Sequence, residues 1–194
     1  MTTIIAEGGM VPVYILIGVV LLILFWAVAN YNYLVRVRNH CQESWSDIDT
    51  ELKRRYDLIP NLVETVKGYA THERETLAAV VEARNRAVAS TGSPASQAKD
   101  ENVLVGSLRQ LFAVSERYPN LKANENFLKL QAELANTEDR IQAARRFYNA
   151  NVRDLNTRIE IFPSSVIAGL FNFRKMEFFE VEDSGVRQAV HVNL

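Results

Sequence analysis

The strongest hint of catalytic chemistry in this 194-residue chain is the pair His72-Glu73 in the run THERETL. The motif HExxH on a helix presents two histidines to zinc and lets the glutamate act as general base. The second histidine would have to be residue 76, which is Thr76. A di-iron bundle centre needs a glutamate three residues before a histidine, and none of the 3 histidines has one. We therefore predict neither a metal site nor a cofactor.

Other catalytic signatures are missing as well. The sequence holds no glycine-rich phosphate loop and no G-x-S-x-G nucleophile elbow. Cys41 is the only cysteine, which excludes an internal disulfide and a CxxC zinc site. A single thiol at an apolar helical position is typical of core packing. We expect no enzyme activity, while a ligand-binding cavity inside the fold stays open.

Charge and composition narrow the class of protein. Lys plus Arg number 22 and Asp plus Glu 23, and 48% of the residues are hydrophobic. The charge balance lacks the positive field with which nucleic-acid-binding proteins neutralise phosphates. The hydrophobic content is sufficient for a buried core. We predict a folded protein with no nucleic-acid partner.

One segment near the N-terminus is apolar enough to cross a membrane. Residues 11–29, VPVYILIGVVLLILFWAVA, carry no charge, and a helix of this length matches a hydrocarbon layer of about 30 Å. A cleaved signal peptide is the alternative, but such peptides begin with a positively charged region, and the first ten residues hold no Lys or Arg. Aromatic residues at the end of the run resemble an interfacial belt. We predict a retained transmembrane helix over residues 11–30, after a short segment of residues 1–10.

The basic residues around this segment predict its orientation. Arg36, Arg38, Lys53, Arg54 and Arg55 all follow it, and no basic residue precedes it. Basic residues near a span stay on the cytoplasmic side. We expect a single-pass protein of the cell membrane, the bacterial inner membrane, with the N-terminus outside and the C-terminal domain in the cytoplasm.

The region after the span shows helical periodicity. Apolar residues recur at steps of three and four in an eleven-residue repeat, and this stripe comprises Leu34, Val37, Cys41, Trp45, Ile48, Leu52, Tyr56, Ile59 and Val63. Pro60 falls inside the pattern, which resumes in phase between Val66 and Val80. We expect a kinked continuation of this helix through Pro60 rather than a corner.

Two further helices are expected. The stretch Ser90–Gln97 has the Ser, Gly and Pro content of a loop, and helical spacing returns over Glu101–Tyr118. A third helix is predicted from Lys122 to Phe162, where apolar residues recur mostly at steps of three and four. Pro163 should end it, because the residue before a proline is pushed out of the helical region.

These patterns predict an all-α protein, with an N-terminal transmembrane helix followed by an elongated antiparallel helical bundle over residues 31–180. Each long helix has one apolar stripe and a polar back, so antiparallel packing buries the stripes together. A helix of about forty residues reaches roughly 60 Å, and we therefore expect a rod. Residues 181–194 are predicted to form a flexible tail.

The segment Phe162–Glu182 is unusually rich in aromatic residues and has two interpretations. In the first, its apolar residues form a short last helix that closes the end of the bundle. In the second, phenylalanines dip into the headgroup region while cations face anionic lipid. The lipid-contacting residues would then be Phe171, Phe173, Arg174, Lys175, Phe178 and Phe179.

Two groups of polar residues are candidates for protein contacts. A possible interaction surface comprises Lys53, Arg54, Arg55, Asp57 and Asn61, although a charge run is more often a solvated face. Asparagines beside packed positions can specify helix register or subunit pairing. Those residues are Asn124, Asn126, Asn149, Asn151 and Asn156.

Several long stretches resemble the LemA family. They are YNYLV from Tyr31, WSDIDTELKRRYDLIPNLVETVKGYATHE from Trp45, LFAVSERYPNLKANENFLKLQAELANTEDRI from Leu111, RRFYNANVRDLN and FPSSVIAGLF. The resemblance covers nearly all of Tyr31–Phe173. It implies a LemA-like, membrane-anchored helical bundle with a short outside N-terminus and a large inside domain, a link to membrane organelles, and no enzyme activity.

Two functions from different classes are consistent with these observations. The first is a structural role, in which the protein forms a homo-oligomer with coiled-coil-like packing, contacts membrane lipid, and organises or remodels the membrane without catalysis. The alternative is an adaptor, an interaction module for another membrane protein such as a protease, sensor or transporter.

Overall fold

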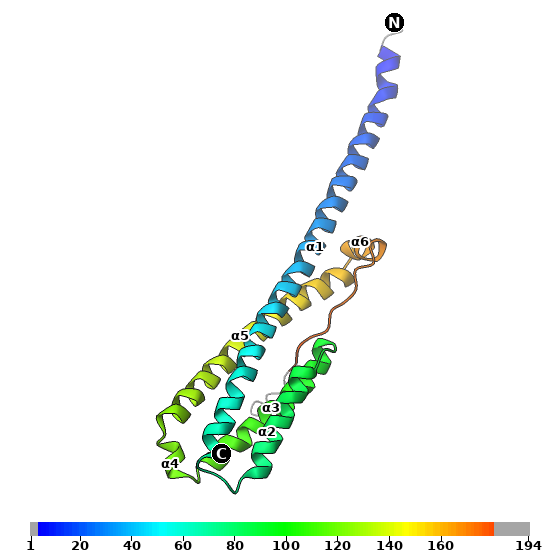
Figure 1. Ribbon diagram of the computed structural model, residues 1–194. Coiled ribbons are helices and arrows are strands. Elements are labelled where there is room, and N and C mark those ends of the chain that lie inside the picture. Colours follow the sequence, from blue (N-terminus) through cyan, green and yellow to red (C-terminus); the bar gives the residue numbers. More distant parts are fainter. Residues whose placement is uncertain (1–3, 181–194) are drawn as a thin grey trace, which may run out of the picture. The chain divides into compact units, whose positions relative to one another are not determined.

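A computed structural model describes residues 4–180 of the chain, with side chains from Met10 onward. These residues form helices without any strand, as Figure 1 shows. The helices are α1 Ile4–Lys67, α2 Arg74–Ala89, α3 Pro94–Ser115, α4 Pro119–Lys122, α5 Glu125–Glu160 and α6 Ser164–Leu170. The prediction of an all-α fold is confirmed. The flexible tail predicted over 181–194 lies outside the described residues, as does the start of the predicted N-terminal segment.

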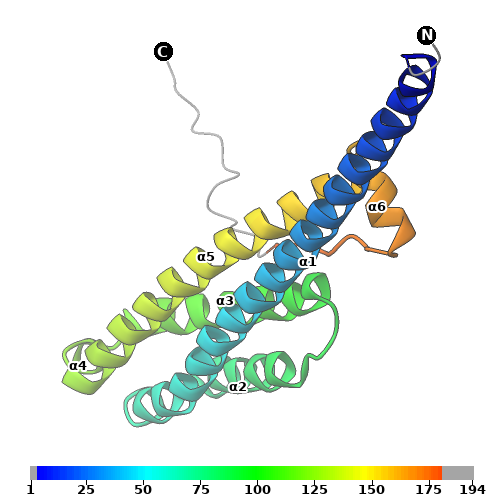
Figure 2. The same ribbon diagram turned by 90° about the horizontal axis from the view of Figure 1, so that it is seen from above.

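The chain divides into two compact units. The anchor unit joins residues up to Cys41 with Asn151–Met176, and the bundle unit joins Gln42–Ala150 with the residues from Glu177. Helices α1 and α5 each contribute residues to both units. Figure 2 shows the same helices from a second direction. Each unit has a core and surface features of its own.

Helix α1 continues through Pro60, as predicted, although proline lacks the N–H that would bond to the carbonyl of Tyr56. The guanidinium of Arg84, on α2, supplies the missing donor, because its Nε donates to the Tyr56 carbonyl oxygen at 3.2 Å. The backbone group left open by the proline is thus satisfied from a neighbouring helix. This contact explains how the stripe passes a proline without the helix ending there.

The predicted continuation of that helix as far as Val80 is wrong, because α1 ends at Lys67. Gly68 follows, a residue that favours helix poorly, and a turn carries the chain into α2. The amides of Tyr69 and Ala70 both donate to the Val66 carbonyl in this turn. Ala70 is fully buried there, so the apolar spacing stays in phase across a corner that periodicity alone does not reveal.

The connection between α2 and α3 is shorter than predicted. Helix α3 begins at Pro94 rather than at Glu101, so the loop reduces to residues 90–93. Proline is accommodated in the first turn because its missing N–H has no intrahelical partner there. The hydroxyl of Ser90 also donates to Asp100 at 2.7 Å, which ties the loop to α3.

The third long helix is interrupted at its start. Helix α4 covers Pro119–Lys122, and α5 begins at Glu125 instead of near Lys122. The side chain of Asn124 caps α5, because its Oδ1 accepts from the Phe127 amide at 3.0 Å. Helix α5 ends at Glu160, before Pro163, which agrees with the prediction that this proline stops it.

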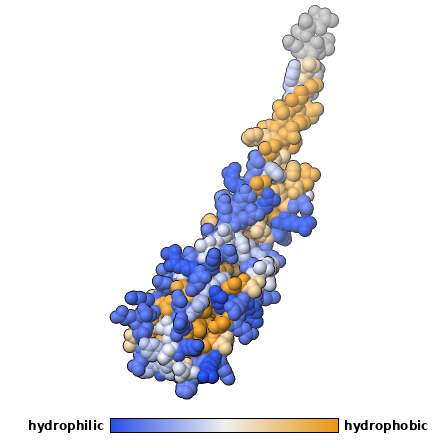
Figure 3. Space-filling view, in the orientation of Figure 1, coloured by the Kyte–Doolittle hydropathy of each residue, from blue (hydrophilic) through white to orange (hydrophobic). Residues whose placement is uncertain are grey.

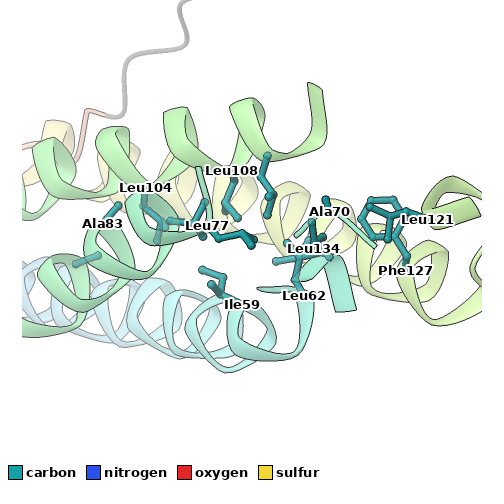
Figure 4. Packing of buried hydrophobic residues seen from close by; sticks show 14 residues of the cluster. Ile59, Leu62, Ala70, Leu77, Ala83, Leu104, Leu108, Leu121, Phe127 and Leu134 are labelled. Carbon is teal, nitrogen blue, oxygen red and sulfur yellow. The ribbon is translucent and has the colours of Figure 1, made fainter. Parts of the chain in front are cut away.

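The bundle unit has one continuous apolar core. Figure 4 shows its side chains pointing toward one another between the helices. The cluster comprises Ile59, Leu62, Val66, Ala70, Leu77, Val80, Ala83, Ala87, Leu104, Leu108, Leu111, Leu121, Phe127 and Leu134. Burial of this surface is the main favourable term for folding of the unit.

The anchor unit has a smaller core, drawn from three helices. Its buried apolar side chains are Leu34, Val37 and Cys41 of α1, Val152 and Leu155 of α5, and Ile167 and Ala168 of α6. The last two belong to a helix whose remaining apolar residues stay exposed. Helix α6 therefore has a buried side and an exposed apolar side.

Candidate functional site

Within the described residues, no other part of the chain covers the apolar segment of α1. Its large side chains from Met10 to Val28 are exposed, for example Phe25 at 76% and Leu22 at 69%. Figure 3 shows hydrophobic residues along this part of α1 and again over α6. Of the helices described, α1 alone has a window long and apolar enough to span a membrane. These observations support a membrane protein, whereas the orientation stays a prediction.

Helix α6 lies against α1 just beyond this apolar segment. The ring of Tyr31 lies 4.6 Å from that of Phe171 and 6.0 Å from that of Phe173, measured between centroids. The guanidinium carbon of Arg38 lies 5.3 Å from the centre of the Phe173 ring, a cation–π contact. Tyr31 and Arg38 of α1 thus contact the residues that directly follow α6.

A polar network on α5 supports the same arrangement. The hydroxyl of Tyr33 donates to Asp154 at 2.9 Å, and the guanidinium of Arg158 lies 4.4 Å from the Tyr33 ring centre. The side-chain amide of Asn156 both donates to the Met176 carbonyl and accepts from the Met176 amide, each at 2.9 Å. Side chains of α5 therefore fix α1 and the segment after α6 together.

The outer side of α6 is apolar and exposed. Phe162, Val166, Leu170 and Phe171 form this surface, which we call the α6 apolar face, and their exposed fractions are 81%, 58%, 75% and 53%. On the opposite side Ile167 is buried. The first interpretation of this segment is therefore half right, since a short helix forms but most of its large apolar residues do not close a core.

The residues predicted to contact lipid differ in their exposure to solvent. Phe171, Arg174 and Lys175 are exposed, and Phe173 is half-buried between Tyr31 and Arg38.

The last two phenylalanines lie elsewhere. Phe178 is half-buried, and Phe179 is fully buried, with its ring 5.4 Å from that of Trp45. A residue packed in this way has no surface to offer lipid, so the inclusion of Phe179 was wrong. Phe162, Val166 and Leu170 were not predicted to contact lipid, because Phe162 was assigned to the third helix and the other two are not aromatic.

A buried ionic cluster lies in the bundle unit. Arg55 is 3% exposed and pairs with Glu101, which is buried too, and with Glu138 at 2.7 Å. The hydroxyl of Tyr56 also donates to Glu101. Burial first, and then the charge of Glu101, raise the pKa of Tyr56 well above its usual range. The cluster joins α1, α3 and α5 through one guanidinium.

The proposed interaction surface therefore needs a correction. Lys53, Arg54, Asp57 and Asn61 are exposed, but Arg55 points into the bundle and pairs with acids there. Adjacent arginines on a helix point in directions about 100° apart, so only one of two neighbours can share a face with Lys53 or Asp57. A run of basic residues in the sequence does not show which of its side chains is buried.

A groove of about 390 Å³ adjoins the buried cluster. Its lining is Arg55, Val105, Leu108, Arg109, Phe112, Gln131, Leu134, Ala135, Glu138, Gln142 and Arg145. These described residues include no serine, cysteine or histidine that would act as a nucleophile or base. Cys41 lies elsewhere, and burial raises the pKa of its thiol to about 11, which keeps it in the unreactive neutral form.

Four of the five candidate asparagines make hydrogen bonds within the described chain: Asn124 caps α5, Asn151 donates to the His40 carbonyl at 3.4 Å, and Asn149 and Asn156 bind the segment after α6. Asn149 donates to the Phe179 carbonyl at 3.1 Å and accepts from the Phe179 amide at 2.9 Å. Asn156 holds Met176 in the same way. Each amide satisfies both backbone groups of a residue in an extended segment, as a neighbouring strand would. Asn149 and Asn156 thus hold the segment after α6. The spacing of residues along α5 does not indicate this partner.

Comparison with known proteins identifies relatives over most of the chain. The model of the LemA family matches residues 44–194. "Protein LemA" of Metamycoplasma hominis is 27% identical over 162 residues, which is 82% of this chain and 73% of that protein. "Magnetosome protein MamQ 2" of Paramagnetospirillum magneticum is 25% identical, and "Magnetosome protein MamQ" of Magnetospirillum gryphiswaldense 24% identical, each over 91% of this chain and 75% of the relative. The chain belongs to the LemA family.

Proposed function

We propose that this protein is a membrane-anchored helical scaffold, which self-associates through α5 and thereby organises or remodels the membrane without catalysis. The observation that carries the proposal is an exposed apolar surface on α5 centred on Phe147, which is 60% exposed. Ala143 and Ala150 flank it at four and three residues and are exposed too. We call these three residues the Phe147 surface.

The shape of this surface favours a helical partner. Residues three and four apart lie on one side of a helix, so a large ring projects between two small side chains. Small residues let a second helix approach closely, and the ring then fills the space between the two backbones. Contiguous exposed apolar surfaces mark contacts with proteins or membranes more often than isolated apolar residues do.

The relatives add support of a different kind. Two of the similar proteins are named as magnetosome proteins, which is consistent with a role at a membrane. The exposed apolar segment of α1 supports the same location. A membrane-bound scaffold explains why the chain combines an apolar anchor segment with helices that have an apolar outer surface.

Energy transfer between labelled copies tests this proposal. Donor- and acceptor-labelled full-length proteins are reconstituted together in vesicles at low density, and Phe147→Glu is compared with Val103→Glu. Val103 is an exposed apolar residue of α3, at 46%, and serves as the matched control. We expect Phe147→Glu to abolish transfer and Val103→Glu to leave it unchanged. Transfer that is absent from the unaltered protein, or equal in all three, contradicts self-association through α5.

The adaptor remains the competing proposal. Lys53, Arg54, Asp57 and Asn61 are exposed on α1 and would form its contact surface. Reversing charge at Lys53 and Arg54 should then remove a co-purifying membrane protein and leave helicity unchanged. A chain that co-purifies with another protein and shows no transfer between its own copies favours this alternative.

A further inference from the structure

The α6 apolar face is largely exposed in the part of the chain that the structure describes, and its ring contact there is that of Phe171 with Tyr31. Val166 and Leu170 are four residues apart and therefore share one side of α6, while Phe162 lies in the turn before the helix and Phe171 follows its last residue. Their exposed fractions exceed one half in every case. Soluble proteins rarely leave several large apolar side chains exposed together, and such patches mark contacts with proteins or membranes.

The position of this face along α1 points to the membrane. The uncharged apolar run ends at Ala29, and Tyr31 follows two residues later, about 3 Å farther along the helix. The Tyr31 ring contacts Phe171, the last residue of the face. If α1 spans the bilayer, the α6 apolar face lies at the depth where hydrocarbon gives way to headgroups.

The polar surroundings fit that depth. Arg38 stacks on Phe173, on the side of Tyr31 away from the apolar run. Arg174 and Lys175 follow within a few residues and are exposed, and Lys175 pairs with Glu160. Cations just beyond a row of aromatic side chains are typical of protein surfaces that meet lipid headgroups.

We infer that the α6 apolar face inserts into the bilayer interface, with lipid at the boundary of headgroups and acyl chains as its partner. The face continues the exposed apolar surface of α1, which lipid already covers in an anchored protein, so lipid is its nearest occupant. The inference rests on the membrane anchoring in the proposed function but not on self-association. It gives the anchor unit a second attachment to the membrane beside its transmembrane helix.

Spin-label accessibility measures the depth directly. Full-length protein carrying Cys41→Ala is placed in nanodiscs with one copy per disc, and a nitroxide is attached at Leu170→Cys. Oxygen concentrates in the bilayer and a water-soluble nickel chelate in the solvent, so the ratio of their collision rates reports depth. Asn39→Cys is the matched control, because Asn39 is exposed on α1 about 12 Å beyond Tyr31.

We expect oxygen to dominate at Leu170 and the nickel chelate to dominate at Asn39. Val166→Cys provides a second label on the same face and should behave as Leu170→Cys does, with circular dichroism confirming that both variants fold. Equal, water-like ratios at all three sites overturn the inference. Protection at Leu170 that appears only in discs with two copies identifies a second chain as the occupant and overturns it too. Single-copy discs make the result independent of self-association.

Discussion

The buried charge of Arg55 offers the sharpest test of how the bundle unit is held together. We predict that Arg55→Met destabilises the protein by about 3–5 kcal/mol, because it leaves Glu101 ionised and buried with only a hydroxyl as donor. The side chains of Arg55 and Glu101 are 3% and 2% exposed, so water does not replace the lost guanidinium. Methionine keeps most of the arginine's apolar stem, which isolates the electrostatic effect from a cavity.

A second substitution separates the cost of a lone charge from the loss of packing. In Arg55→Met/Glu101→Gln, the amide is neutral and still accepts from Tyr56, so only modest penalties remain. Glu138 is 33% exposed and is solvated when its partner is removed. We expect the double variant to recover about 2–3 kcal/mol relative to Arg55→Met.

The assay is urea unfolding of the full-length protein in mild detergent, followed by circular dichroism. Arg54→Met is the matched control, an exposed neighbour that should change the free energy of unfolding by less than about 0.5 kcal/mol. A loss below about 1 kcal/mol in Arg55→Met, or a double variant no more stable than the single one, would refute the account of a buried ion pair.

Four further predictions concern Asn149, Cys41 and the orientation of the chain. Asn149→Ala removes both hydrogen bonds to the Phe179 backbone and should lower stability by about 1–3 kcal/mol in urea titrations, whereas Asn126→Ala, at an exposed position, should change little. The Cys41 thiol, with its pKa raised to about 11, should react with iodoacetamide at pH 8 far more slowly in the folded protein than in urea, and equal rates would contradict its burial. The same raised pKa favours the folded state fully below about pH 9 and loses that contribution as pH rises toward 11, so stability should fall more steeply over this window in the unaltered protein than in Cys41→Ala, where the raised pKa of Tyr56 still contributes. A fluorescent protein fused to the C-terminus should be fluorescent and protected from external protease in intact cells, and cleavage there would reverse the orientation predicted from Arg36 and Arg38.

Spacing of apolar residues predicted the helices but not their ends. The stripe through Ile59 and Val63 did indicate a helix that passes Pro60, and it could not reveal that Arg84 satisfies the open carbonyl. It also ran in phase across the turn at Ala70, because a buried turn residue keeps the same spacing as a helical one. Periodicity reports which residues are buried, and it does not report the backbone that connects them.

The sequence predicted a functional surface only where the composition of one continuous segment identifies it. The absence of charge over residues 11–29 predicted an apolar helix long enough to span a membrane, and α1 contains such a segment. Arg55 and Asn149 required the structure, since their partners lie far along the chain and an arginine or asparagine on a helix has the same sequence signature whether solvated or paired. The lipid prediction did not include Val166 and Leu170 of the α6 apolar face. They lie in a segment where the phenylalanines give the stronger signal of a membrane interface.

The mass of the full-length protein in mild detergent tests the central claim of self-association most directly. Light scattering with the detergent contribution subtracted gives the number of copies per particle, after purification at native abundance. A discrete assembly of many copies, reduced to single chains by Phe147→Glu, is the predicted result. A monomer or dimer that carries a different protein with it would contradict the scaffold and favour the adaptor.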